Sequence, residues 1–131
     1  MILFVNQAPI AWLSKRQTRV ESSTFGSETV VLRIAIDMIE SLRCKLHMMV
    51  VSVDEAMMIF CDNDAVVKST SKPESTRKKK HNAVNWHRCM ESQAAGWCRL
   101  AWLGTNMNLA DLFTKTLPGP TRKRLLERIL W

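Results

Sequence analysis

The sequence contains no tyrosine, only four glycines and four prolines, and neither an internal repeat nor a low-complexity segment. Its first nine residues lack a basic flank, and their apolar stretch is too short for a signal-peptide core or a membrane span. They read instead as a strand that begins at the first residue. We therefore expect no membrane-inserted segment here, and a domain that opens inside a strand suggests that something is missing upstream.

A close CxxC pair is also absent, although the chain has four cysteines, at Cys44, Cys61, Cys89 and Cys98. Without that spacing, neither a zinc knuckle nor a dithiol redox motif is indicated. We expect four reduced thiols in an intracellular protein. A mixed zinc site formed by His81, His87 and Cys89 stays open as an alternative.

Size and charge define the class of protein. The chain has 131 residues, which fits one domain, and 47% of them are hydrophobic, which is enough for a core. Its formal net charge is +7 and its pI is about 9.6. Such a balance favours an anionic partner, most simply nucleic acid, with ordinary basic solubility as the alternative.

Hydrophobic periodicity and turn residues predict a mixed α/β domain. In chain order we expect a hairpin (2–5 and 9–13), a helix (24–47), a buried strand (56–61), a short helix through Lys68, a helix (77–95), a strand (97–103), a helix (109–115) and a basic amphipathic C-terminal helix. Thr24 is the predicted N-cap of the first helix, Gly96 the stop of the third, and Asn108 the cap of the next.

Glu28 is unusual because it falls on the apolar stripe of the predicted helix 24–47. That stripe consists of Val31, Leu32, Ala35, Ile39, Leu42 and Leu46. A step of four residues back from Leu32 reaches Glu28. The helix N-terminus stabilises a carboxylate by only about 0.3–1 kcal/mol. A nearby metal ion or cation is therefore the better explanation.

Two further carboxylates lie at the ends of predicted strands or helices. Asp62 directly follows the buried strand 56–61, and Asn63 or Asp64 can cap the next helix. Ligands often bind beyond the carboxyl ends of strands in α/β sheets. Asp111 falls in the first turn of helix 109–115, where a capping role is an alternative. Carboxylates gathered from separate elements hold a divalent ion such as Mg²⁺, although an ion-pair network is also possible.

A basic run marks the start of the predicted helix 77–95. Cations at a helix N-terminus oppose the helix dipole, and a bound phosphate would relieve that conflict. A solvated charged face is the alternative. The candidate nucleic-acid contacts are Arg77, Lys78, Lys79, Lys80 and His81.

Five strings, in order and in spacing, resemble copia-type retrotransposon polyproteins. They are residues 8–17 (APIAWLSKRQ), Ser22-Ser23-Thr24 with Ser27-Glu28, Phe60-Cys61-Asp62-Asn63, Lys80-His81, and residues 108–115 (NLADLFTK). Together they resemble the ribonuclease H domain that follows the reverse transcriptase in that polyprotein. The resemblance extends from about Ile2 to Pro120. It implies a ribonuclease H-like domain over residues 1–117, followed by a basic helix over 118–131.

The resemblance implies a fold and a reaction. The family's fold is a mixed five-stranded sheet flanked by helices, and its reaction is hydrolysis of the RNA strand of an RNA–DNA hybrid. The family's metal-binding carboxylates fall on Glu28, Asp62 and Asp111, with Mg²⁺ or Mn²⁺ as the ion. The implied partners are the hybrid and the reverse transcriptase domain of the parent polyprotein, without a membrane. The implied location is a cytoplasmic virus-like particle or the nucleus.

The sequence departs from the family at one position. The family's first metal-binding aspartate lies on the first strand of the sheet, upstream of the strand that here starts at Ile2, and no acidic residue precedes Glu21. We therefore expect an apparently truncated ribonuclease H-like sheet without its first strand, and little or no activity from the isolated chain. The alternatives are a non-catalytic nucleic-acid-binding remnant and a pseudogene fragment.

Overall fold

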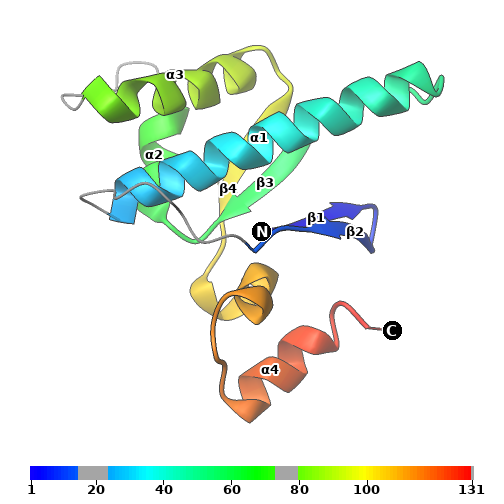
Figure 1. Ribbon diagram of the computed structural model, residues 1–131, viewed down its shortest axis with the longest axis vertical. Coiled ribbons are helices and arrows are strands. Elements are labelled where there is room, and N and C mark those ends of the chain that lie inside the picture. Colours follow the sequence, from blue (N-terminus) through cyan, green and yellow to red (C-terminus); the bar gives the residue numbers. More distant parts are fainter. Residues whose placement is uncertain (15–23, 73–79, 131) are drawn as a thin grey trace. The chain divides into compact units, whose positions relative to one another are not determined.

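The computed structural model describes residues 1–14, 24–72 and 80–130, and leaves out the side chains of residues 80–82. These residues form two compact units. One comprises Met1–Arg19 and Leu103–Trp131, and the other comprises Val20–Trp102. The mixed α/β class expected from the sequence is confirmed, because both units contain strands and helices (Figure 1).

The larger unit packs three helices and two parallel strands. Its elements are α1 (Thr24–Met48), β3 (Met57–Cys61), α2 (Asp64–Ser71), α3 (Lys80–Ala94) and β4 (Cys98–Trp102). Strand β3 pairs with β4 in parallel, with Ile59 opposite Leu100. Helix α1 contacts α3, and each of the three helices contacts a strand (Figure 1).

Helix α1 buries a stripe that differs in part from the predicted one. Leu32 and Ile39 are buried as expected, whereas Val31 is 41% exposed and the unpredicted Ile36 is fully buried. The steps of three and four residues from Leu32 through Ile36 to Ile39 follow the helical period. Glu28 stands four residues before Leu32 and thus begins the same stripe, as predicted.

Strand β3 is buried on one face only, so the expectation of a fully buried strand is wrong. Ile59 is buried, whereas its neighbours Met58 and Phe60 are 50% and 59% exposed. Side chains alternate between the two faces of a strand. An apolar run that looked like a two-sided core strand therefore has one covered face.

The smaller unit contains the hairpin and the C-terminal elements. Strands β1 (Ile2–Val5) and β2 (Ala8–Trp12) pair antiparallel around Asn6, whose φ of 55° is left-handed, so the predicted asparagine-bearing turn is confirmed. Two short 3₁₀ helices, η1 (Thr105–Met107) and η2 (Leu109–Phe113), precede α4 (Gly119–Leu126). Within this unit Trp12 stacks on Phe113, with ring centroids 6.2 Å apart. None of the helices described is long and apolar enough to cross a membrane.

Candidate metal centre

Glu28 enters the candidate site from the first part of α1. The helix begins at Thr24, so the residue predicted as its cap is its first helical residue, and Glu28 lies one turn further on. Its Oε2 atom is buried, and the buried residues Gly26 and Thr29 lie on either side in sequence. The helix therefore holds one carboxylate oxygen of Glu28 away from bulk solvent.

Asp62 enters from the end of β3, and a helix cap fixes the turn that follows it. The Asn63 side chain accepts hydrogen bonds from the backbone N–H groups of Ala65 and Val66, at 3.0 and 3.2 Å. Asn63 is therefore the N-cap of α2, one of the two caps foreseen. The other candidate, Asp64, is the first helical residue and pairs with Lys68 at 2.5 Å.

Glu28 and Asp62 converge, and a third side chain joins them. One ligand atom from each of Glu28, Cys61 and Asp62 lies within 4.8 Å of the others. All three residues are half-buried. Glu28 lies on α1 and Asp62 directly after β3, so the two carboxylates are 34 positions apart in the sequence (62 − 28), and the sulfur comes from the last residue of β3. The described part of the chain shows no second such cluster of His, Cys, Asp and Glu.

The cluster has an electrostatic signature at the sulfur. Burial raises the pKa of the Cys61 thiol most, and a contact from Sγ to the Asn63 carbonyl oxygen at 3.9 Å opposes that rise. The carboxylates of Glu28 and Asp62 raise this pKa further. Like charges that approach one another disfavour the ionised thiol. The thiol therefore shares one anionic environment with both carboxylates.

The donor set fits a divalent ion. Two carboxylates supply the oxygen ligands that Mg²⁺ and Mn²⁺ prefer, and a divalent cation would neutralise the charge that gathers there. Sequence reasoning identified both carboxylates but treated Cys61 only as one of four reduced thiols. Its position immediately before Asp62, at the carboxyl end of a strand, was the available signal.

Asp111 belongs to the smaller unit, and the structure describes each unit by itself. It is 6% exposed, and its Oδ2 accepts a hydrogen bond from Lys115 Nζ at 3.0 Å. The cap of η2 is Asn108, whose side chain accepts from the Ala110 backbone N–H, as the sequence predicted. The bond to Lys115 therefore gives Asp111 an ion-pair role inside its own unit, and metal binding by this residue stays a prediction.

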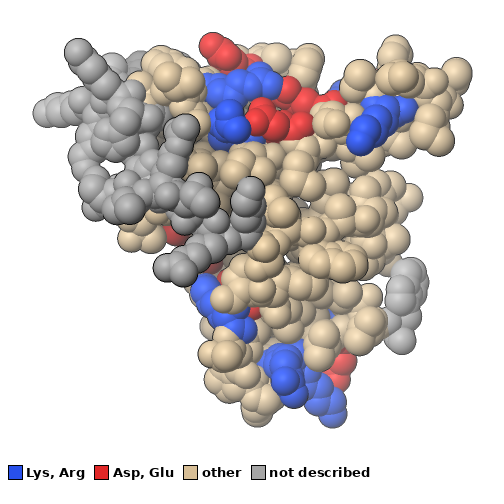
Figure 2. All heavy atoms as spheres, in the orientation of Figure 1, with Lys and Arg blue, Asp and Glu red and all other residues tan. Residues whose placement is uncertain are grey.

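The predicted nucleic-acid contacts fall largely beyond the described residues. Arg77, Lys78 and Lys79 lie outside them, as do the side chains of Lys80 and His81. On the face drawn in Figure 2, basic side chains form separate groups that alternate with acidic ones. Helix α4 carries one exposed basic group, Arg122, Lys123 and Arg124.

The remaining residues of the alternative zinc site have different surroundings. Cys89 is fully buried in α3, and His87 is exposed, with its ring 4.9 Å from that of Trp86. The His81 side chain lies outside the described residues. Four free cysteines agree with the expectation of reduced thiols.

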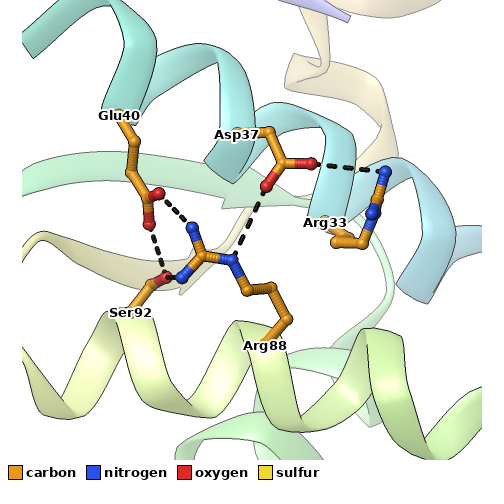
Figure 3. Close-up of polar contacts among 5 residues, drawn as sticks. All are labelled: Arg33, Asp37, Glu40, Arg88 and Ser92. Carbon is orange, nitrogen blue, oxygen red and sulfur yellow. Dashed lines mark hydrogen bonds and ion pairs between the residues drawn. The ribbon is translucent and has the colours of Figure 1, made fainter. Parts of the chain in front are cut away.

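An ion-pair network, the alternative considered for the three carboxylates, occurs elsewhere on α1. Arg88 of α3 pairs with Glu40 of α1, and the Ser92 hydroxyl donates to Glu40 Oε1 at 2.7 Å (Figure 3). Arg88 Nε also lies 3.7 Å from Asp37, which Arg33 approaches to 3.3 Å. This polar clamp, formed by Arg33, Asp37, Glu40, Arg88 and Ser92, joins α1 to α3. Sequence reasoning missed it, because its two halves lie 48 residues apart.

Two curated relatives from Arabidopsis thaliana resemble the chain. The retrovirus-related Pol polyprotein from transposon RE1 is 28% identical over 131 residues, covering 98% of this chain. The corresponding polyprotein from transposon RE2 is 25% identical over 116 residues, covering 88% of this chain. These matches support a retrotransposon Pol polyprotein origin.

The chain spans only 8–9% of the length of these relatives. No family model matches the sequence, and no solved structure matches it. The comparisons therefore support an origin in a retroelement polyprotein without indicating which of its activities this part carries.

Proposed function

We propose that this chain is a ribonuclease H-like domain of a copia-type Pol polyprotein, a kind of domain whose reaction is hydrolysis of the RNA strand of an RNA–DNA hybrid with divalent ions. The convergence of Glu28 and Asp62 within 4.8 Å carries the proposal. The two residues lie on a helix and at a strand end, in strings that resemble the family's metal-binding motifs. The Pol polyprotein relatives support the coarser part of the proposal, an origin in a retrotransposon Pol polyprotein.

Each carboxylate has a defined part in this proposal. Glu28, near the start of α1, and Asp62, directly after β3, would hold a Mg²⁺ or Mn²⁺ ion. When bound, such ions activate water for attack on the phosphodiester and stabilise the departing oxygen. The protein's own task is to orient the carboxylates. The Asn63 cap serves that task because it fixes the turn after Asp62.

The net charge of +7 supports a polyanionic substrate. Binding that depends on phosphate contacts releases counterions and weakens as the salt concentration rises. We expect the affinity of the chain for an RNA–DNA hybrid to fall steeply between low and physiological salt. Binding that does not respond to salt would contradict a phosphate-directed interface.

Metal binding is the decisive test, measured as Mn²⁺ affinity by electron paramagnetic resonance on the full 131-residue chain. The loss of a hydrogen-bond partner to a metal ligand already costs 10–100-fold in affinity, so we expect Asp62→Asn to weaken Mn²⁺ binding by at least about tenfold. Glu28→Gln should act in the same direction. Asp64→Asn is the matched control, because Asp64 lies in the same turn and pairs with Lys68.

Equal Mn²⁺ affinity for the unchanged chain, Asp62→Asn and Asp64→Asn would overturn the proposal. A labelled hybrid then separates catalysis from binding. The family's first aspartate has no counterpart among these 131 residues, so we expect this chain to bind the hybrid and cleave it slowly or not at all. Rapid metal-dependent cleavage that Asp62→Asn abolishes would contradict that inactivity.

A non-catalytic nucleic-acid-binding remnant is the second candidate, favoured by the high net charge. It predicts salt-dependent binding of the hybrid with no contribution from Glu28 or Asp62. Hybrid binding that persists unchanged in Asp62→Asn, together with a chain that binds no Mn²⁺, would select this candidate.

A further inference from the structure

A cysteine sulfur stands beside the two carboxylates of the candidate metal centre. Cys61 Sγ and one oxygen each of Glu28 and Asp62 lie within 4.8 Å of one another. The three side chains are half-buried and not fully enclosed. A sulfur at this place changes which ions the site can accept.

Sulfur and carboxylate oxygen prefer different metals. Carboxylates suit hard ions such as Mg²⁺ and Mn²⁺, whereas thiolates bind softer ions such as Zn²⁺ and Cd²⁺. Two oxygens and one sulfur supply three ligands and leave the fourth position of a tetrahedral site open. Three protein ligands with one open position are typical of catalytic zinc sites. The same cluster therefore offers a two-oxygen site to a hard ion and a three-donor site to a thiophilic one.

The other described cysteines lie in different surroundings. Cys89 and Cys98 are buried, and Cys44 is exposed on α1. In the residues that the structure describes, Cys61 alone belongs to a group with metal-ligating side chains. Cys44 therefore serves as a matched control for a general thiol effect.

We propose that Cys61 makes this centre a binding site for a thiophilic divalent ion of the Zn²⁺ class, held by Cys61 Sγ with Glu28 and Asp62. The inference rests on the proposed function, because it uses the same two carboxylates. Binding through sulfur releases the thiol proton to solvent and forms a metal–sulfur bond. A thiophilic ion then competes with Mg²⁺ or Mn²⁺ for the carboxylates, so it acts as an inhibitor of the hard-ion site.

The test measures Cd²⁺ binding through the ultraviolet charge-transfer absorption of a cadmium–thiolate bond. The full chain and the Cys44→Ser variant should both show this band at the first equivalent of Cd²⁺. Cys61→Ser should lose this band. In that variant the ratio of Cd²⁺ to Mn²⁺ affinity should fall by at least about tenfold. Loss of a residue that hydrogen-bonds to a metal ligand already lowers metal affinity about 10–100-fold, and loss of the ligand itself should lower it at least as much. A first-equivalent band that Cys61→Ser retains would overturn the inference.

Alkylation of the unchanged chain gives a test without a variant. Stoichiometric Zn²⁺ should slow the reaction of iodoacetamide with Cys61 by at least about tenfold, read from the mass of its peptide, and should leave the rate at Cys44 unchanged. Equal rates at Cys61 with and without Zn²⁺ would contradict the inference.

The two proposals fail in different ways. If Asp62→Asn weakens Mn²⁺ binding while Cd²⁺ gives no Cys61-dependent band, only the thiophilic site is wrong. If Asp62→Asn leaves both Mn²⁺ and Cd²⁺ binding unchanged, the carboxylate centre itself is wrong, and both proposals fall together.

Discussion

Helix α1 carries two groups of acidic side chains that meet opposite surroundings. Glu40, only 13% exposed at its side chain, meets the guanidinium of Arg88 and the hydroxyl of Ser92 (Figure 3). Glu28, three turns earlier, meets Asp62 and a thiol. Glu40 is therefore paired with a cation, whereas Glu28 lies close to a second carboxylate and a thiol. A half-buried carboxylate therefore indicates a ligand-binding site only when the neighbouring side chains are known.

Breaking the polar clamp should have the largest effect on stability. Removing one partner of a buried ion pair costs about 3–5 kcal/mol, and we expect Arg88→Met to lower the free energy of unfolding by about 3 kcal/mol, because this pair is partly exposed. Urea denaturation measures the loss. The double variant Arg88→Met with Glu40→Gln should recover part of it, and additive losses would show that the two residues are not coupled.

The carboxylate centre should respond to metal, unlike the clamp. Mn²⁺ at about 100 times its dissociation constant should raise the free energy of unfolding by about 2.7 kcal/mol, because only the folded chain brings Glu28 and Asp62 together. Asp62→Asn should show much less of this gain in thermal unfolding. With chelator present, the same variant should be no less stable than the unchanged chain, since a like charge has been removed.

A buried thiol next to the clamp predicts a pH dependence. Burial, more than the neighbouring charges, raises the pKa of Cys89 to about 12 from an ordinary value of 9.0. Between those pH values the unfolded chain has lost the thiol proton and the folded chain keeps it, so the unfolded chain binds fewer protons. Stability therefore falls as the pH rises through this window, by at most about 1.4 kcal/mol per pH unit from this group.

Urea denaturation at several pH values between 9 and 11 measures the slope. Cys89→Ala should reduce the alkaline slope, whereas Cys44→Ala should retain it, because Cys44 is exposed. An identical slope in the Cys89 variant would mean that this thiol ionises equally easily in the folded and unfolded chains.

The C-terminal end of α1 predicts a smaller, stabilising change. Val50 has a φ of 60°, and the Val51 N–H donates to the Leu46 carbonyl oxygen at 2.9 Å, the bond pattern of a Schellman cap. Glycine fits this left-handed position without a side-chain clash, so Val50→Gly should raise the free energy of unfolding by about 1 kcal/mol. Val51→Gly is the control. Val51 does not have a left-handed backbone conformation, so glycine removes no strain there and should not stabilise the chain.

The smallest effect is expected at the exposed edge of the clamp. The side chains of Arg33 and Asp37 are each 41% exposed, so their pair is screened by solvent. Asp37→Asn should change the free energy of unfolding by less than about 1 kcal/mol, in contrast to Arg88→Met. If Asp37→Asn lowered the free energy of unfolding as much as Arg88→Met does, the exposed pair and the Arg88–Glu40 pair would contribute to stability as one unit.

Local signals predicted most element positions. The helix expected over 24–47 is Thr24–Met48, and the strand expected over 97–103 is Cys98–Trp102. Gly96, with a φ of 73°, ends α3 as predicted. These features depend on helical period, capping side chains and backbone freedom, all of which act between residues close in sequence.

Features that depend on distant residues were predicted less well. The sequence pattern did not indicate that Met58 and Phe60 are exposed on one face of β3, because an apolar run does not show how many faces are covered. The partnership of Glu40 with Arg88 links two helices that no local pattern connects. Ribonuclease H-like chemistry and the role of Asp111 stay predictions.

The sequence by itself determined the class of fold, the Asn6 turn, the Asn63 and Asn108 caps, and the two carboxylates that converge. Periodicity and short-range hydrogen bonding are encoded within a few residues, so they can be read directly. Only the tertiary structure decided that Glu40 meets a cation, that Glu28 meets Asp62, and that Cys61 completes the group. The charge state and ligand preference of a side chain depend on what packing places beside it, and that placement is a property of the folded chain.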